Sequence, residues 1–499
     1  MTRQVDAPSR SDRFVAGLSQ LIGGPIGDHA VRRDRFWNAG RIVLALTCLT
    51  LALHWVQKSP CRNPLNWVDL QQYTRFCYSD VIALYSAEGG LSVGGLPYLD
   101  YPLEYPVLTG VLMALIGVPV HRLGLAYPTL NQHTWFYDGT ALALAVMAVA
   151  SVAMMLSLRE RRPWDVAMFA LAPALLVTAT VNWDLLAVVF AVGGLYAWAQ
   201  RRPVLAGVLL GLGTAAKLWP GFLLLPLIFL GLRAGRLRPA GTAVAAGAAA
   251  WVAVNVPVML GDYLRNGDLD NWSRFLRLNT ERGVDWGTFW YVGRYLEGRW
   301  FSGQPGDQGP FLWLSWHVDP HLNLLSYALF ALACTGIGYL ALRAPRPPRV
   351  AALGFLTVAA FLLFAKVWSQ QFVLWLLPLV VLARPRWGAF LAWQAAEVGY
   401  FLAFYGQLIL QSGRNIMTEG VFILAATLRW VTVAALCVLV IRDILRPDQD
   451  ALRRSYDGAD PDAGLLGEPD AAADSGGQSR KTMTPSISSR VTPNSAPVA

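Results

Sequence analysis

The segment FCYSDVIALYSAEGG, residues 76 to 90, contains one carboxylate that could do chemistry, that of Asp80. It lies between a Tyr-Ser pair and an apolar stripe, shortly after a very apolar segment. A carboxylate can take a proton from a hydroxyl group as a general base. It can also cap the first turn of a helix, which is its more ordinary role. Asp80 is therefore a candidate for catalysis, with helix capping as the alternative interpretation.

Lysine is rare in this chain, which has 37 Arg but only four Lys: Lys58, Lys217, Lys366 and Lys481. Lys217, in AAKLWPG, and Lys366, in FAKVWSQQ, each lie near a Trp at the end of an apolar run. An ammonium group in such a position can hold a phosphate as a point charge. It can also simply extend its charge to the membrane surface. Two lysines at the same predicted level favour a phosphate site.

Composition indicates which elements must position these groups. The 499 residues are 55% hydrophobic and 15% charged, with 20 Trp, which is too apolar for one soluble core. The sequence predicts an all-α polytopic membrane protein of about 12 transmembrane helices. Apolar runs suited to crossing about 30 Å of hydrocarbon occur at 40–57, 138–158, 166–181, 183–200, 204–216, 218–232, 240–260, 321–342, 350–366, 371–384, 387–405 and 421–441.

Arginine-rich loops predict the orientation, because short cytoplasmic loops carry an excess of Arg and Lys. The Arg clusters lie at 159–163, 201–203, 233–239, 343–349, 384–387 and 442–446. All of them face the cytoplasm only if a further apolar run, 105–120, does not cross the membrane. We therefore expect 105–120 to be a re-entrant or juxtamembrane helix. Two long external loops, 58–137 and 261–320, then share one face, and both termini are cytoplasmic.

Three parts of the chain are predicted. Residues 1–39 form a cytoplasmic N-terminus, in which DRFVAGLSQLIGG has the apolar spacing of a surface helix. Residues 40–445 form the transmembrane domain. Residues 446–499, rich in Asp, Gly, Ser, Pro and Ala, are predicted to be a disordered cytoplasmic tail.

Two pairs of residues have predicted structural roles. Cys61 and Cys77 share the first external loop, where an oxidising exterior would allow a disulfide, although spacing alone does not establish one. Glu397 and Arg429 lie in the last two apolar runs at similar depth. An ionisable group there should be paired or functional. We favour a structural Glu397–Arg429 pair, with a proton relay as the alternative.

Three segments together resemble a known family of membrane enzymes. They are YSDVIALYSAEGGLSVGGLPYLDYPLEYPVLTG, NWDLLAVVFAVGGLYAWAQRRPVLAGVLLGLGTAAKLWPGFLLLP and KVWSQQFVLWLLPLVVLA. The chain resembles the GT-C glycosyltransferases over roughly residues 75–385. Within them it is most similar to the branch of polyprenyl-phosphate-mannose-dependent α-mannosyltransferases that build bacterial envelope glycolipids.

The resemblance implies a multi-pass enzyme of the bacterial plasma membrane with an extracytoplasmic active site. The donor would be a polyprenyl-phosphate sugar, most simply mannose, and the acceptor a hydroxyl of a glycolipid or polysaccharide. Asp80 matches the acidic residue that the family carries in its first external loop, and it would act as the general base in an inverting transfer. No metal, cofactor or nucleic-acid partner is expected.

The remaining site residues follow from this chemistry. Cations must stabilise the leaving phosphate, and the candidates are Lys217 and Lys366, with Arg274 or Arg277 from the second loop. The candidates for substrate contacts are Tyr78, Glu104, Tyr105, Asn182, Asp184, Trp219, His317, Trp368, Gln370 and Gln371.

A flippase or transporter of lipid-linked sugars is the alternative function. Such a protein would be expected to show repeated halves and a site near the midplane of the membrane. The sequence shows no convincing repeat, and its polar groups gather at one predicted face. Both observations favour the enzyme.

Overall fold

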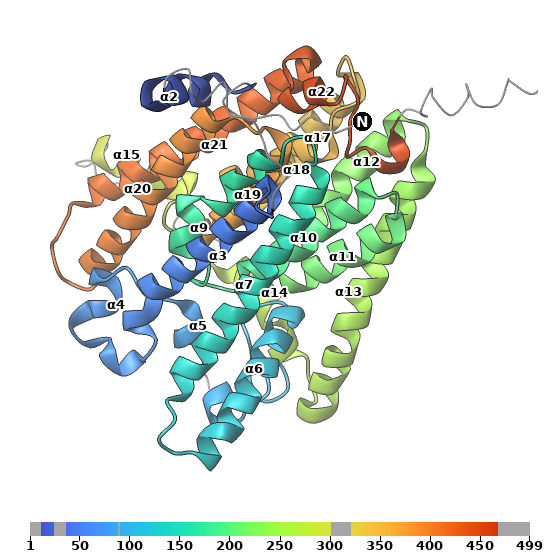
Figure 1. The fold of residues 1–499 in the computed structure, drawn as a ribbon. Helices are drawn as coiled ribbons and strands as arrows, with labels where there is room; N and C mark the ends of the chain where they lie inside the picture. Colours follow the sequence, from blue (N-terminus) through green and yellow to red (C-terminus); the bar gives the residue numbers. More distant parts are fainter. Residues whose placement is uncertain (1–10, 24–35, 88–89, 301–320, 468–499) are drawn as a thin grey trace, which may run out of the picture.

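The computed structural model describes residues 11–23, 36–87, 90–300 and 321–467, and its regular elements there are helices (Figure 1). One predicted site residue, His317, lies outside the described residues. The α-helices are α2 Arg13–Gly23, α3 Ala39–Lys58, α4 Gln71–Thr74, α5 Asp80–Ala83, α6 Val107–Ala126, α7 Gln132–Leu158, α8 Ala167–Ala170, α9 Pro173–Thr178, α10 Asp184–Ala199, α11 Pro203–Ala216, α12 Leu224–Arg233, α13 Leu237–Asn266, α14 Asp270–Glu281, α15 Phe289–Trp300, α17 Asn323–Arg343, α18 Val350–Phe364, α19 Val373–Ala383, α20 Trp387–Gln411, α21 Glu419–Leu445 and α22 Ala451–Ser455.

Within these ranges, six helices are long and apolar enough to cross a membrane: α3, α6, α7, α13, α17 and α21. Helix α20 has 25 residues but is not among these six. Several further apolar helices are shorter; α10 has 16 residues. At 1.5 Å per residue, a helix of that length spans about 24 Å, short of about 30 Å of hydrocarbon. The chain is a polytopic all-α membrane protein, as predicted. The prediction of about twelve spans corresponds to six helices of spanning length together with shorter apolar helices.

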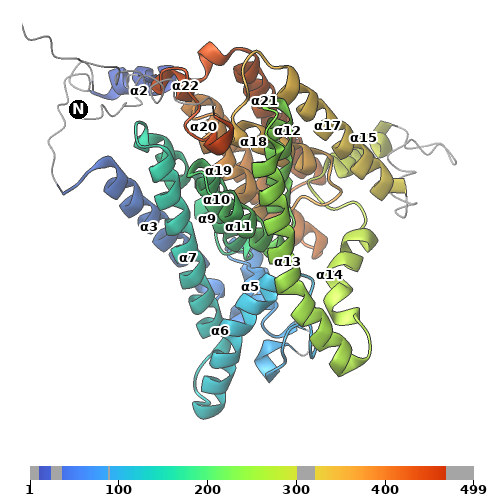
Figure 2. The same ribbon diagram turned by 90° about the vertical axis from the view of Figure 1, so that its right-hand side faces the viewer.

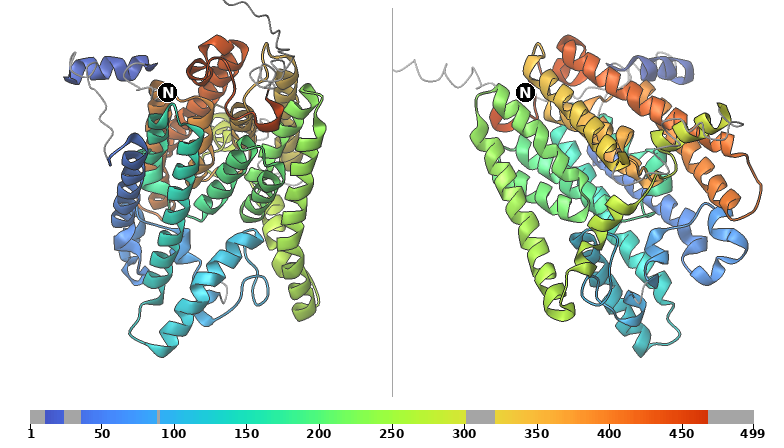
Figure 3. Two further views of the ribbon diagram at one scale, coloured as in Figure 1. Left: turned by 45° about the vertical axis from the view of Figure 1, so that its right-hand side comes forward. Right: turned by 180° about the vertical axis from the view of Figure 1, so that it is seen from behind.

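The shorter helices form the core of the bundle. All 11 residues of α19 are buried, and so are 13 of the 15 residues of α18. A helix that is apolar on every side is stable only when it is surrounded. Longer helices supply that cover, with α7 beside α10, α13 beside α11, and α21 beside α18 (Figures 2 and 3).

Helices α11 and α13 pack closely because small residues face each other. A Cβ atom on Gly207 or Gly211 of α11 would collide with the backbone of α13 at Ala243 or Gly247. Small residues four apart allow this close approach in membrane helices. The contact holds α11, and with it Lys217 directly after its last residue, against a helix of spanning length.

The arginine-rich loops meet at one end of the bundle, which carries α2 and α22 in Figure 1. Arg159 and Arg349 both donate hydrogen bonds to the carbonyl of Leu382, and Arg233 donates to the carbonyls of Ala341 and Ala344. The opposite end carries α4, α5 and the C-terminal end of α6. This segregation of charge is what the positive-inside rule requires of a cytoplasmic face.

Helix α6 is longer than the predicted re-entrant segment 105–120. It is one continuous helix of 20 residues that ends at Ala126. It begins where α11 ends, since Thr109 donates a hydrogen bond to the carbonyl of Ala216 at 2.8 Å. From there it runs beside the Gln132 end of α7, away from the arginine-rich end (Figure 3). Length and composition would allow α6 to cross a membrane, so its juxtamembrane role stays a prediction.

Residues 446–467 differ from the predicted disordered tail. They form α22 and pack against the arginine-rich end of the bundle. Asp450 pairs with Arg349 and Asp462 pairs with Arg159, each at 2.8 Å. Their acidic composition suggested solvation, whereas these carboxylates neutralise buried arginines. Residues 468–499 lie outside the described part of the chain.

We predict that Asp462→Ala destabilises the protein by about 3–5 kcal/mol, because the fully buried Arg159 would lose its carboxylate partner. Thermal unfolding of the detergent-solubilised protein measures this effect. Asp457→Ala is the matched control, since Asp457 pairs with the half-exposed Arg161 and its carboxylate is largely in solvent. It should change stability by less than about 1 kcal/mol. Equal losses in the two variants would contradict the assignment.

Candidate active site

The backbone at Asp80 is fixed by the preceding serine and by the turn before α10. The hydroxyl of Ser79 accepts a hydrogen bond from the amide of Val81, so Ser79 is the N-cap of α5. The same hydroxyl donates to the carbonyl of Thr180 at 2.6 Å, and the amide of Asp80 donates to the carbonyl of Val181 at 2.9 Å. Asp80 is therefore not the helix cap, and its carboxylate is available for another role.

Asn182 holds the carboxylate of Asp80. Its Nδ2 donates to Asp80 Oδ2 at 2.9 Å and contacts the hydroxyl of Tyr105, while its Oδ1 accepts from the amide of Trp183. Burial raises the pKa of Asp80, and the negative charge of Glu104 raises it further. Hydrogen bonds from Asn182 and Tyr78 oppose the effect of burial. The result is a carboxylate that is more basic than an exposed one.

A cavity of about 590 Å³ opens beside Asp80. It lies between residues of the first long loop, 58–137, the ends of the short bundle helices, and α14. Eight of the residues singled out from the sequence line this cavity: Asp80, Glu104, Tyr105, Asn182, Lys217, Trp219, Lys366 and Gln371. Residues separated by up to almost 300 positions thus share one site.

Lys217 lies close to a second carboxylate. Its Nζ is 3.6 Å from Oδ1 of the buried Asp184 and 4.8 Å from the centre of the Tyr105 ring. Asp184 also accepts a hydrogen bond from Trp375 Nε1 at 2.6 Å. Asp184 therefore pairs with Lys217 but does not itself line the cavity.

Lys366 contacts the second long loop at Thr280. Its Nζ donates to the carbonyl of Thr280 at 3.0 Å, and Nδ2 of Asn323 donates to the same carbonyl. Thr280 is in the last turn of α14, so Lys366 both lines the cavity and helps to hold this helix over it.

Helix α14 covers the cavity with one face, beside the end of α13 (Figure 2). Its first turn is anchored by Trp272, whose indole Nε1 donates to Asn255 at 3.1 Å and whose amide donates to Asp262 at 2.9 Å. Phe275, Leu278 and Asn279 line the cavity.

Arg274 and Arg277, the predicted phosphate ligands, do not line the cavity. They form ion pairs with Glu281 and Asp270 within α14. The loop arginine that does line the cavity is Arg282, which pairs with Glu104 at 2.8 Å. Helical phase explains the error, since positions 274 and 277 fall away from the face that carries 275, 278 and 279.

Two other predicted contacts, Trp368 and Gln370, lie behind the cavity wall and are buried. The guanidinium group of Arg429 lies 4.3 Å from the Trp368 ring centre and donates to the Trp368 carbonyl. Arg429 also pairs with Glu397 at 3.0 Å, which is the predicted structural pair. Tyr78 is likewise not on the wall, and its ring contacts Trp67.

Sequence reasoning missed Asp285, which lines the cavity. Its amide donates to the carbonyl of Lys366 at 2.9 Å, and its carboxylate accepts from the amide of Trp286. Burial raises the pKa of this carboxyl group. Asp285 connects the second loop to the segment that carries Lys366, and the sequence VDWG gives no signal of that long-range contact.

The first loop also contains a disulfide between Cys61 and Cys77, whose Cα atoms are 5.6 Å apart. It ties the end of α3 to the segment that leads to Asp80. Among the described residues, no three His, Cys, Asp or Glu side chains are grouped so that they could hold a metal ion.

Comparison with known proteins gives the family. The model of glycosyltransferase family 87 matches residues 104–369, more than half of the chain. The match includes Lys217, Lys366 and α14, whereas Asp80 and the disulfide precede it. No curated protein matches the chain. From the extent of the match, the chain belongs to glycosyltransferase family 87, a GT-C family of polyprenyl-phosphate-mannose-dependent mannosyltransferases.

Proposed function

We propose that this membrane glycosyltransferase moves a mannosyl residue from polyprenyl-phosphate mannose to a hydroxyl group of a glycolipid or polysaccharide. The reaction takes place on the extracytoplasmic side of a bacterial plasma membrane. The observation that carries the proposal is that Asp80, Lys217 and Lys366 line one cavity at the end of the bundle away from the arginine-rich loops. Membership of an enzyme family sets the transporter alternative aside.

Asp80 acts as the general base. Its carboxylate takes the proton of the acceptor hydroxyl while that oxygen attacks C1 of the sugar. Burial and the charge of Glu104 raise its pKa, which makes it a better proton acceptor. Asn182, fixed by Tyr105 and by the amide of Trp183, orients the carboxylate. Direct displacement inverts the configuration, so a β-linked donor gives an α-linked product.

The leaving phosphate needs positive charge, because negative charge accumulates on it as the bond to C1 breaks. Lys366 and Arg282 line the cavity on the side of α14. Lys217 lies on the other side, against Tyr105. We assign the donor phosphate to these three cations, with Arg282 in place of Arg274 and Arg277. Trp219 and Gln371, also on the wall, remain candidates for sugar contacts.

Asp80→Asn should lower kcat by roughly 10²–10⁴-fold, because the amide cannot accept the proton. The measurement is transfer of labelled mannose from synthetic polyprenyl-phosphate mannose to a membrane glycolipid extract. Asp69→Asn is the control, since Asp69 lies in the same loop with an exposed carboxylate. Normal transfer by a folded Asp80→Asn protein would exclude Asp80 as the base.

The pH dependence of kcat should report the titration of Asp80. The base works only when deprotonated, so its raised pKa places the acidic limb of the profile above the ordinary aspartate value of 3.8. Glu104→Gln removes a negative charge, lowers the pKa of Asp80 and should move this limb to lower pH. Glu281→Gln, at the exposed pair with Arg274, should leave the limb in place. A limb that moves upward in Glu104→Gln would refute this electrostatic assignment.

Lys366→Met should raise the KM for the lipid-phosphate donor roughly ten- to hundredfold, the range expected for losing one hydrogen bond to a charged group. Arg277→Met is the control and should bind the donor normally, because Arg277 points away from the cavity and pairs with Asp270. Initial rates at varied donor concentration give the comparison. If Arg277→Met has the larger effect, the phosphate site has been misplaced.

A further inference from the structure

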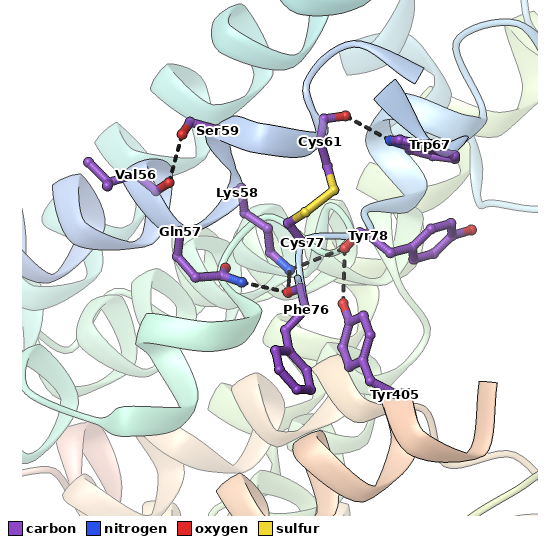
Figure 4. Close-up of a disulfide and its surroundings, with 10 residues drawn as sticks. All are labelled: Val56, Gln57, Lys58, Ser59, Cys61, Trp67, Phe76, Cys77, Tyr78 and Tyr405. Atoms are coloured by element: carbon purple, nitrogen blue, oxygen red, sulfur yellow. Dashed lines mark hydrogen bonds between the residues drawn. A yellow bond between two sulfur atoms is a disulfide. The ribbon is translucent and has the colours of Figure 1, made fainter. Parts of the chain in front are cut away.

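Lys58, another of the four lysines of the chain, has no role in the mechanism above and yet is fully buried. It is the last residue of α3, three positions before Cys61. Its Nζ donates to the carbonyls of Phe76 and Tyr78, at 3.2 and 3.1 Å (Figure 4). These two residues flank Cys77, the disulfide partner of Cys61.

The segment that Lys58 holds adopts a backbone conformation that is unfavourable by itself. Phe76 has φ of 56°, in the left-handed region that residues with a side chain rarely occupy. Such a conformation persists only when its surroundings fix it. Besides Lys58, Gln57 donates to the Phe76 carbonyl and Tyr405 donates to the Tyr78 carbonyl at 3.2 Å.

The same segment leads directly into the catalytic carboxylate. Only one residue, Ser79, lies between Tyr78 and Asp80, so a shift of residues 76–78 moves the Asp80 side chain relative to Asn182. Lys58 forms no ion pair at 4.0 Å or less with any carboxylate of the described residues, and its charge interacts with that of Asp80. Its ammonium group also lies 5.7 Å from the ring centre of Phe401 and 5.9 Å from that of Tyr405.

We propose that Lys58 is a positioning residue for Asp80. This inference rests on the proposed function of Asp80 as the base. Lys58 clamps the carbonyls on both sides of Cys77, and the Cys61–Cys77 disulfide joins the clamp to the end of α3. The clamp sets the distance between the carboxylate and the acceptor hydroxyl. The charge of Lys58 also favours the ionised form of Asp80.

The proposal predicts effects on chemistry and not on donor binding. Lys58→Met should lower kcat roughly ten- to hundredfold through misplacement of the base, with little change in the KM for the donor. The acidic limb of the kcat profile should move to higher pH, because a positive charge near Asp80 is gone. The ionisable groups that interact with Asp80 are Tyr78, Glu104, Tyr105, Lys217, Tyr405 and Lys58, and in this variant only Lys58 changes. Lys58→Arg should keep the limb in place and recover part of kcat.

Arg414→Met is the matched control, since Arg414 also donates to a carbonyl of the first loop, that of Asp69, but at the exposed surface. It should leave kcat and the pH profile unchanged. Tyr405→Phe provides a second test should Lys58→Met not fold. It removes one hydrogen bond to the Tyr78 carbonyl and no charge, so kcat should fall without a shift of the acidic limb.

The outcomes separate this proposal from the proposed function. The positioning role alone is overturned if the wild-type protein transfers mannose and a folded Lys58→Met variant has an unchanged kcat and pH profile. A Tyr405→Phe variant of normal kcat does the same where Lys58→Met cannot be purified. Wild-type protein that transfers no sugar from any lipid-phosphate donor defeats the proposed function itself.

Discussion

The hydrogen bond from Asn182 to Asp80 joins two parts of the chain that lie 102 residues apart in the sequence. Asp80 begins the short helix α5 in the segment between α3 and α6, whereas Asn182 belongs to the turn that begins α10. Because the amide of Asp80 also donates to the carbonyl of Val181, the carboxylate takes its position from the helical bundle. The loop contributes the reactive group, and the bundle determines where that group lies.

The cavity exists because the central helices are short. Helix α10 begins at Asp184, α11 ends at Ala216 and α18 ends at Phe364, so three helix ends meet at one level. Helix ends leave backbone groups without partners within the helix, and polar side chains accumulate beside them. Lys217 follows the end of α11 directly, and Lys366 follows the C-cap residue of α18. The long helices surround the short ones, and α14 covers the cavity at these helix ends.

Much of the site could be predicted because ionisable residues are conspicuous in an apolar sequence. Asp80, Lys217 and Lys366 were recognisable for that reason, and the GT-C resemblance placed them in one enzyme. The sequence predicts Arg274 and Arg277 as phosphate ligands, whereas the face that α14 turns to the cavity depends on the contacts of Trp272 with α13. The contact between Glu104 and Arg282 joins two loops that no local pattern connects. The sequence likewise predicts a disordered tail in the acidic stretch after α21. The arginine partners of Asp450 and Asp462 lie far away in the sequence, and no local pattern reveals them.

That acidic stretch also determines the order in which the protein can be completed. Arg159 and Arg349 are synthesised long before Asp462 and Asp450, which follow the last membrane helix. Until Asp450 and Asp462 have been synthesised, both guanidinium groups lack their carboxylate partners. This end of the bundle therefore reaches its final charge balance only after the helices that flank the two arginines have been made.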